Sequence, residues 1–230
     1  MGNSGERRVA SLPSGFAALD EALGAGLPRG HLVEIAGPAG SGKTTLILQT
    51  VAHLQRAGLT AAWLDADHTF DAAWAARLGV DTASMPLAQP DSAEQALDIA
   101  RTLAQSGAVD LLVMDSAAAL VPQLEKSLGI GSAPGLHSRV LASGLRKLSG
   151  VCSRTAVCAV FLNQLRNRAA GGGETSAGGP PLKLFAGVRL MLEPAGGRKV
   201  RVRVVKNNAF AGVSGRELEW RPDAGFAESP

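Results

Sequence analysis

The chain has 230 residues, a formal net charge of +3 and an aromatic content of only 4%. This length allows one large domain with a full sheet core, and the scarcity of aromatic residues indicates a core of alanine, valine and leucine. No apolar run approaches the roughly 20 residues that cross a membrane, and the N-terminus lacks the apolar segment of a signal peptide. These features exclude an integral membrane protein. We expect a cytoplasmic chain whose two cysteines, Cys152 and Cys158, are buried thiols rather than a metal or disulfide site.

Apolar runs alternate with helix-forming runs through the first two thirds of the chain. The expected strands span residues 32–36, 60–65, 109–115 and 156–162, and the expected helices span residues 14–23, 43–56, 71–78, 92–105 and 136–152. Ser14 is a candidate N-cap of the first helix. The alternation of strand and helix predicts right-handed crossovers and an α/β fold with a mostly parallel central sheet flanked by helices.

The pattern changes after residue 187. Residues 188–193 and 199–206 are successive strand patterns with no helix between them, which predicts antiparallel C-terminal strands. Valines alternate with basic residues over 198–206, so this strand has one core face and one basic face, which either contacts a partner or only solubilises the edge. Residues 169–181 are rich in Gly, Ala, Ser and Pro, which predicts a mobile loop or a segment that is disordered in isolation.

A complete G-x-x-x-x-G-K-[ST] pattern lies between the first expected strand and the following helix, and strand, loop and helix in this order predict a phosphate-binding loop. Its residues are Gly37, Pro38, Ala39, Gly40, Ser41, Gly42, Lys43 and Thr44, with Thr45 next in the helix. Backbone N–H groups and the helix N-terminus bind phosphate oxygens in such a loop, while the lysine supplies a charge and the threonine hydroxyl binds Mg²⁺. The alternative is a glycine-rich turn with a chance lysine. We expect a nucleoside triphosphate site.

Two other expected strands end in carboxylates. Asp115 ends an apolar run, so it would face the ligand crevice of an open sheet and hold Mg²⁺ opposite Thr44. Asp65 and Asp67 end another strand, and either acid could orient the water that attacks the γ-phosphate. The alternative for these two acids is a helix cap or a solvated loop.

Several segments then carry a resemblance to one family. They include Phe161-Leu162-Asn163-Gln164-Leu165-Arg166 and the stretches 64–80, 89–97, 106–110, 113–120 and 201–207. In unbroken order over residues 10–225, the chain resembles the bacterial RecA recombinase family. The resemblance implies a RecA-like P-loop NTPase that uses ATP and Mg²⁺. It divides the chain into a short segment 1–10, an ATPase core 11–225 and a tail 226–230.

The resemblance implies roles at matched positions. Asp67 stands where the family has its catalytic glutamate, and it is one methylene shorter. Trp74 matches an aromatic residue that stacks on adenine, and Asp71 matches a residue that contacts the adenine amine. Gln164 matches the glutamine that senses the γ-phosphate and couples it to DNA, although a strand-end amide can also serve only the backbone.

Lys206 matches one of two lysines that reach the ATP of a neighbouring protomer, and Asn208 stands at the second position. Loss of that cation would weaken charge stabilisation across the interface. We therefore expect weak filament-coupled hydrolysis.

Two loops match the family's DNA-binding loops. The first spans 125–136 and is followed by a helix that bears Arg139 and Arg146. The second spans 165–181, with Arg166 and Arg168 at its start and Gly178 and Gly179 near its end. Arginines beside flexible glycines suit the phosphate backbone of single-stranded DNA, while the alternative is simple solvated charge.

Two functions remain open. Only about ten residues precede the matched region, so we expect no full oligomerisation arm. This favours a minimal accessory protein of the ImuA type that binds single-stranded DNA and acts in the SOS response with RecA or error-prone polymerase components. The alternative is an active DNA-dependent ATPase that promotes homologous recombination and strand exchange. A small-molecule kinase is disfavoured because no lid with paired arginines is recognisable.

Overall fold

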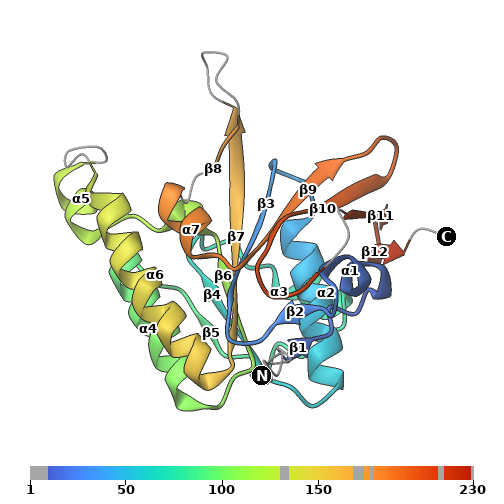
Figure 1. Cartoon of the computed structure of the whole chain (residues 1–230), viewed down its shortest axis with the longest axis horizontal. Helices are drawn as coiled ribbons and strands as arrows, with labels where there is room; N and C mark the ends of the chain where they lie inside the picture. Colours follow the sequence, from blue (N-terminus) through green and yellow to red (C-terminus); the bar gives the residue numbers. More distant parts are fainter. Residues whose placement is uncertain (1–9, 130–134, 168–173, 177–178, 212–214, 229–230) are drawn as a thin grey trace, which may run out of the picture.

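The structure, a computed structural model, describes residues 10–129, 135–167, 174–176, 179–211 and 215–228. Its centre is a sheet with the strand order β12-β11-β10-β9-β3-β7-β6-β4-β5, and β8 pairs with the end of β7 (Figure 1). The strands are β3 (Leu32–Gly37), β4 (Ala61–Asp65), β5 (Leu87–Ala88), β6 (Leu111–Asp115), β7 (Cys158–Asn167), β8 (Glu174–Ser176), β9 (Val188–Pro194), β10 (Lys199–Asn207), β11 (Gly215–Arg221) and β12 (Gly225–Glu228). A separate two-stranded sheet pairs β1 (Ser11–Leu12) with β2 (Leu27–Pro28).

The sheet has a parallel part and an antiparallel part, as the sequence predicts. Strands β5, β4, β6, β7, β3 and β9 are parallel to their neighbours, and β10, β11 and β12 follow as antiparallel strands. The inner strands β3, β4 and β6 are buried along nearly their whole length because helices cover both of their faces. Strand β10 has Val202 fully buried and Lys199, Arg201 and Arg203 exposed, which confirms the two-faced pattern over these residues.

Helices form one layer on each face of the sheet (Figure 1). Helices α1 (Ala17–Leu23), α2 (Lys43–Arg56) and α3 (Ala72–Arg77) contribute to one apolar core. Helices α4 (Ala93–Ser106), α6 (Leu136–Thr155) and α7 (Gly179–Phe185) contribute to the other. Shorter elements, η1 (Ala117–Ala119) and α5 (Gln123–Leu128), connect β6 to α6. No helix within the described part of the chain is long and apolar enough to span a bilayer.

Local capping explains where several helices begin. The side chains of Ser92 and Asp71 accept hydrogen bonds from the backbone N–H groups of Gln95 and Trp74, which caps α4 and α3. The prediction for Ser14 is wrong. Helix α1 begins after Phe16, and the buried Ser14 hydroxyl bonds the backbone of Phe16 in the turn before it.

Three further expectations need correction. Residues 169–181 are not simply a loop, because they include β8 and the start of α7, although 169–173 and 177–178 lie outside the described residues. Residues 226–228, which we expected in a tail, belong to β12. The expected first DNA loop, residues 125–136, likewise contains most of α5. Residues 130–134 of this loop lie outside the described part of the chain. Both cysteines are free and buried, as expected.

Strand β12 is attached to α2 by one side chain. Gln49 accepts a hydrogen bond from the Phe226 N–H at 2.8 Å and donates to the carbonyls of Phe226 and Ala224. The amide of Gln49 thus acts as a strand partner for the edge of β12. It fixes the C-terminal strands beside the helix that follows the glycine loop.

Gln49→Ala is expected to destabilise the fold by about 1 to 3 kcal/mol, because it leaves Phe226 backbone groups without partners in a half-buried place. For a chain of this size that corresponds to a fall in Tm of roughly 2 to 4 °C per kcal/mol. Thermal unfolding checks this. Gln105→Ala, at an exposed position of α4, is the matched control and should leave Tm nearly unchanged. An equal Tm for the two variants would contradict the proposed role of Gln49 in holding β12.

Candidate nucleotide-binding site

The glycine loop connects β3 to α2, as the sequence predicts. Strand β3 ends at Gly37 and α2 begins at Lys43, directly after Gly42. Gly42 has φ +85°, and a Cβ there would lie 2.4 Å from the ring of Phe226. A Cβ at Gly37 would lie 2.7 Å from the Leu192 carbonyl oxygen. Both positions therefore need glycine, and the loop is held between strands that come from distant parts of the chain.

Lys43 lies folded over its own loop. Its Nζ donates to the carbonyl oxygens of Gly37 at 3.0 Å and Pro38 at 2.7 Å. Burial lowers the pKa of Lys43, and the negative charge of Asp115 partly offsets this effect. The ammonium group is thus surrounded by weak partners that a phosphate oxygen can replace. The ammonium can therefore exchange these carbonyl partners for the oxygens of a bound polyphosphate.

Thr44 and Asp115 meet across the site. The Thr44 hydroxyl donates to Asp115 Oδ2 at 3.0 Å, and Asp115 ends β6 next to Asp65 of β4 in the parallel register. One hydroxyl and one half-buried carboxylate are oxygen donors, and Mg²⁺ is typically bound by one or two protein oxygens together with waters and phosphates. No cluster of three or more metal-binding side chains occurs among the described residues. These residues fit Mg²⁺.

Asp115 has an unusual environment for a carboxylate. Burial raises its pKa to about 6 from 3.8; the Thr44 hydrogen bond opposes this, while nearby Asp67 and Asp65 add to it. The charged form of Asp115 is therefore disfavoured, and a bound cation would stabilise it.

Asp115→Asn is expected to stabilise the nucleotide-free protein at pH 8 by about 2 to 3 kcal/mol, because a difference of about two pH units between 3.8 and 6 is worth about 1.4 kcal/mol per unit. The wild-type penalty is fully present above about pH 6 and absent below about pH 4, where the carboxyl is protonated in both states. Thermal unfolding at pH 8 and pH 4 checks this, with exposed Asp91→Asn as control. A variant no more stable than wild type at pH 8 would contradict it.

The structure separates the two acids at the end of β4. Asp65 is 1% exposed and accepts hydrogen bonds from the backbone N–H groups of Thr69 and Phe70, each at 3.0 Å. The side chain of Gln89 donates to it as well. Asp65 is therefore a structural residue that shapes the loop. Asp67 is exposed, and its backbone N–H donates to the Asp115 carbonyl, so it is the acid available to a bound ligand.

Trp74 lies beside the glycine loop within an aromatic group that the sequence did not reveal. Its Nε1 donates to the Thr45 hydroxyl at 3.2 Å, and its ring lies 6.2 Å from that of Trp220 on β11. Trp220 in turn contacts Phe226 at 5.3 Å. The Asp71 carboxylate accepts from the Trp74 backbone N–H, so it also caps α3. Strand β11 thus brings a second large aromatic ring to the edge of the site.

Gln164 lies next to the glycine loop. In the parallel register of β3 and β7 it pairs with Gly37, and it is half-buried. The preceding Asn163 is fully buried and donates to Glu34 Oε1 at 2.8 Å, while Glu34 also forms an ion pair with Arg189. A buried polar network therefore connects β3, β7 and β9 below the site. It fixes the strand from which Gln164 projects.

The predicted DNA-contacting residues do not form one continuous group in the described structure. Arg139 and Arg146 are exposed on α6, two turns apart. Arg166 lies in β7 with its side chain outside the description, Arg168 and Gly178 lie outside the described residues, and Gly179 begins α7. The grouping of the second loop therefore stays a prediction.

Lys206, predicted to reach a neighbouring protomer, is engaged within its own chain. Its Nζ donates at 3.3 Å to the carbonyl oxygens of Lys183 and Leu184 in the last turn of α7. A cation at a helix C-terminus is favourable. In this structure Lys206 therefore stabilises the end of α7.

The chain matches known proteins over nearly its full length. The model of the RecA N-terminal domain family matches residues 1–219. The Protein RecA of Rubrobacter xylanophilus is 47% identical over 221 residues, which cover 90% of this chain and 64% of the relative. The Protein RecA of Acidothermus cellulolyticus is 46% identical over 241 residues, covering 99% and 70%, and that of Bifidobacterium longum is 46% identical over 221 residues, covering 90% and 56%. The chain thus spans roughly two thirds of the length of these relatives, and it belongs to the RecA family.

Proposed function

We propose that the chain is the ATPase core of a RecA-type recombination and repair protein, which binds Mg-ATP and single-stranded DNA in the cytoplasm. The observation that carries the proposal is the meeting of Lys43, Thr44 and Asp115 at an intact glycine loop. This group provides a cation, a hydroxyl and a carboxylate where the parallel strands end, which is the usual ligand crevice of such a sheet. The core that we propose extends from residue 11 to Glu228, where β12 ends.

The described residues suit distinct parts of the nucleotide. Backbone N–H groups of residues 37–44 and the ammonium of Lys43 would bind the phosphates, and Thr44 and Asp115 would hold Mg²⁺. When bound, Mg²⁺ neutralises charge that develops on the phosphate oxygens. Trp74 offers a ring for the base, and Asp71 lies one helical turn away from it. Asp67 is the acid we propose to orient the attacking water.

Gln164 is the residue that we propose to connect nucleotide and DNA. It lies between Gly37 of the phosphate loop and the segment after β7, where the second DNA loop is predicted. A bound γ-phosphate would contact its amide and shift the end of β7. DNA bound at the second loop would act on the C-terminal end of β7, the strand that carries Gln164. Each ligand would therefore change the affinity of the chain for the other.

Two observations favour an active ATPase over an accessory protein that only binds. The glycine loop leads directly into α2, and Thr44 and Asp115, the residues that we propose to hold Mg²⁺, lie within hydrogen-bond distance of each other. In addition, the relatives that share 46% to 47% identity all carry the name Protein RecA. The accessory form, with RecA or polymerase components as partners, is the second candidate. The features that favour it are the shorter Asp67 and the Asn208 at a cationic position of the family.

ATP turnover with and without single-stranded DNA tests the proposal. We expect turnover that rises at least tenfold with DNA, and a stimulation that falls steeply with added salt because phosphate contacts release counterions. Gln164→Ala should retain ATP binding and lose most of the stimulation. Binding of Mg-ATP without stimulated turnover would support the accessory form. No binding of either ligand would contradict both candidates.

A further inference from the structure

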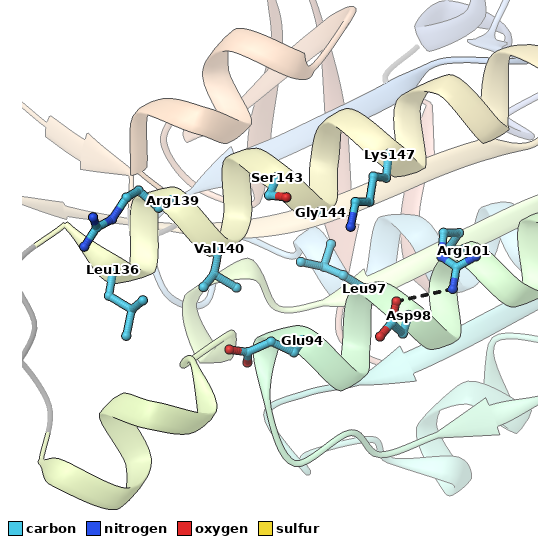
Figure 2. A pocket seen from close by; sticks show the side chains of 10 residues that line it. All are labelled: Glu94, Leu97, Asp98, Arg101, Leu136, Arg139, Val140, Ser143, Gly144 and Lys147. Carbon is cyan, nitrogen blue, oxygen red and sulfur yellow. Dashed lines mark hydrogen bonds and ion pairs between the residues drawn. The ribbon is translucent and has the colours of Figure 1, made fainter.

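A groove runs between α4 and α6 on the side away from the nucleotide site. Its first part is a hollow of about 420 Å³ whose lining is shown in Figure 2. Leu97 of α4 and Leu136 and Val140 of α6 point into this hollow. Gly144 lies at its floor, where a Cβ would meet the Leu97 side chain at 2.3 Å. The glycine lets the two helices approach closely, and the floor of the groove is apolar.

The groove continues along the same two helices. A second hollow of about 520 Å³ shares Asp98, Arg101 and Lys147 with the first and extends to Arg154. From Leu136 to Arg154 the α6 side of the groove is roughly 27 Å long, at 1.5 Å per residue. A partner helix of about 18 residues would span this length at the same rise per residue. The groove is therefore long enough to hold a helix of about four turns.

The two sides of the groove differ in charge. Among the described residues, no carboxylate lies within ion-pair distance of Arg139, Arg146, Lys147 or Arg154 on the α6 side. On the α4 side, Asp98 forms an ion pair with Arg101 at 3.5 Å (Figure 2).

Glu94, also on the α4 side, accepts a hydrogen bond from the Gln123 N–H at 3.0 Å. The carboxylates of the groove are thus already engaged, and so is Arg101 on the α4 side, whereas the cations of the α6 side are not paired with a described carboxylate. Strand β10 shows the contrast, since Arg201 and Arg203 there are both paired with glutamates.

We propose that the α4–α6 groove binds an acidic amphipathic helix of a partner protein. Its apolar residues would contact Leu97 and Val140, and its carboxylates would face Lys147 and Arg154, the α6 cations that are not among the predicted DNA-contacting residues. The groove suits a helix better than a nucleic acid strand. Its apolar floor has no donors for phosphates, and no aromatic ring on which a base could stack is among the residues that line either hollow.

The test uses a fluorescent 16-residue helical peptide with leucines along one face and glutamates on both sides of them. Fluorescence anisotropy should show saturable binding to the full chain. Val140→Asp places a carboxylate on the floor and should weaken binding at least tenfold. Thr102→Asp adds the same charge to an exposed part of α4 outside the groove, and it should change binding less than twofold. If Val140→Asp unfolds, Ser143→Trp fills the groove from an exposed position and takes its place.

The controls separate a helix site from a merely cationic surface. A peptide of the same composition, shuffled so that the leucines no longer share one face, should bind at least tenfold more weakly. Equal binding of both peptides would overturn the proposal. Full binding of the peptide to both groove variants, with displacement by a 20-nucleotide single strand, would assign the surface to nucleic acid instead. Nucleotide hydrolysis is not needed for any of these outcomes.

Discussion

Lys43→Ala is expected to lower ATP turnover about 100- to 1,000-fold, the usual effect of removing one group that stabilises the charge of a transition state. Lys43 places its positive charge at the phosphate loop, where its Nζ lies 2.7 Å from the Pro38 carbonyl oxygen. Without it the phosphates would keep the backbone N–H groups but lose the nearby positive charge. Steady-state turnover with saturating Mg-ATP and single-stranded DNA provides the measurement.

The control for Lys43 is Lys126→Ala. Lys126 is an exposed lysine of α5 with no carboxylate in ion-pair range among the described residues. Because it lies in the predicted first DNA loop, it is compared with wild type without DNA, where its removal should leave turnover within twofold. Thermal unfolding should show that both variants are folded. Turnover that survives in a folded Lys43→Ala protein would mean that phosphate is bound elsewhere.

Asp67→Glu is expected to raise ATP turnover tenfold or more. A well-placed general base contributes about 100- to 10,000-fold to a rate, and a carboxylate that reaches the water poorly provides only part of this factor. Asp67 is exposed beside Asp115, whose pKa it helps to raise, so its carboxylate is close to the residues that we propose to hold Mg²⁺. The added methylene extends it towards the position of a γ-phosphate. Single-turnover rates would measure the chemical step directly.

Asp67→Asn should have the opposite effect, because the amide keeps the size and loses the base. Asp91→Glu lengthens an exposed acid elsewhere and should leave the rate unchanged. Equal rates in Asp67→Glu, Asp67→Asn and wild type would show that another group orients the water. In that case the length of the Asp67 side chain would not limit the rate of ATP hydrolysis.

Most of the parallel half of the fold was predictable because its signals are local. The run from Leu32 to Gly37, the glycine loop and the periodic helix after it determine β3 and α2 within a few neighbouring residues. The antiparallel strands β11 and β12 were not predicted. Strand β11 mixes Arg216, Glu217 and Glu219 with few apolar residues, and it is stabilised by pairing with β10 instead of by an apolar run of its own.

Helix α7 shows how a local signal can mislead. The Gly178-Gly179-Pro180-Pro181 sequence suggests flexible chain, yet α7 begins at Gly179 and the two prolines occupy its first turn. Proline is tolerated there because the first N–H groups of a helix have no intrahelical partner. The buried Leu182 then attaches the helix to the core.

The site was predictable as far as its residues belong to motifs. Lys43, Thr44 and Asp115 meet as their types and spacing indicate. The sequence could not separate Asp65 from Asp67, because only the hydrogen bonds to Thr69 and Phe70 show that the first acid is structural. Contacts between distant segments, such as those of Trp74 with Trp220 or of Glu34 with Asn163 and Arg189, depend on the tertiary fold and have no signal in a single stretch of sequence.

Calorimetric titration of Mg-ATP into the wild type and Lys43→Ala tests the nucleotide site most directly. The account predicts one nucleotide bound per wild-type chain, with an affinity at least tenfold weaker in Lys43→Ala and no effect of Lys126→Ala. Absence of binding heat in the wild type at millimolar nucleotide, confirmed at a second temperature, would contradict it.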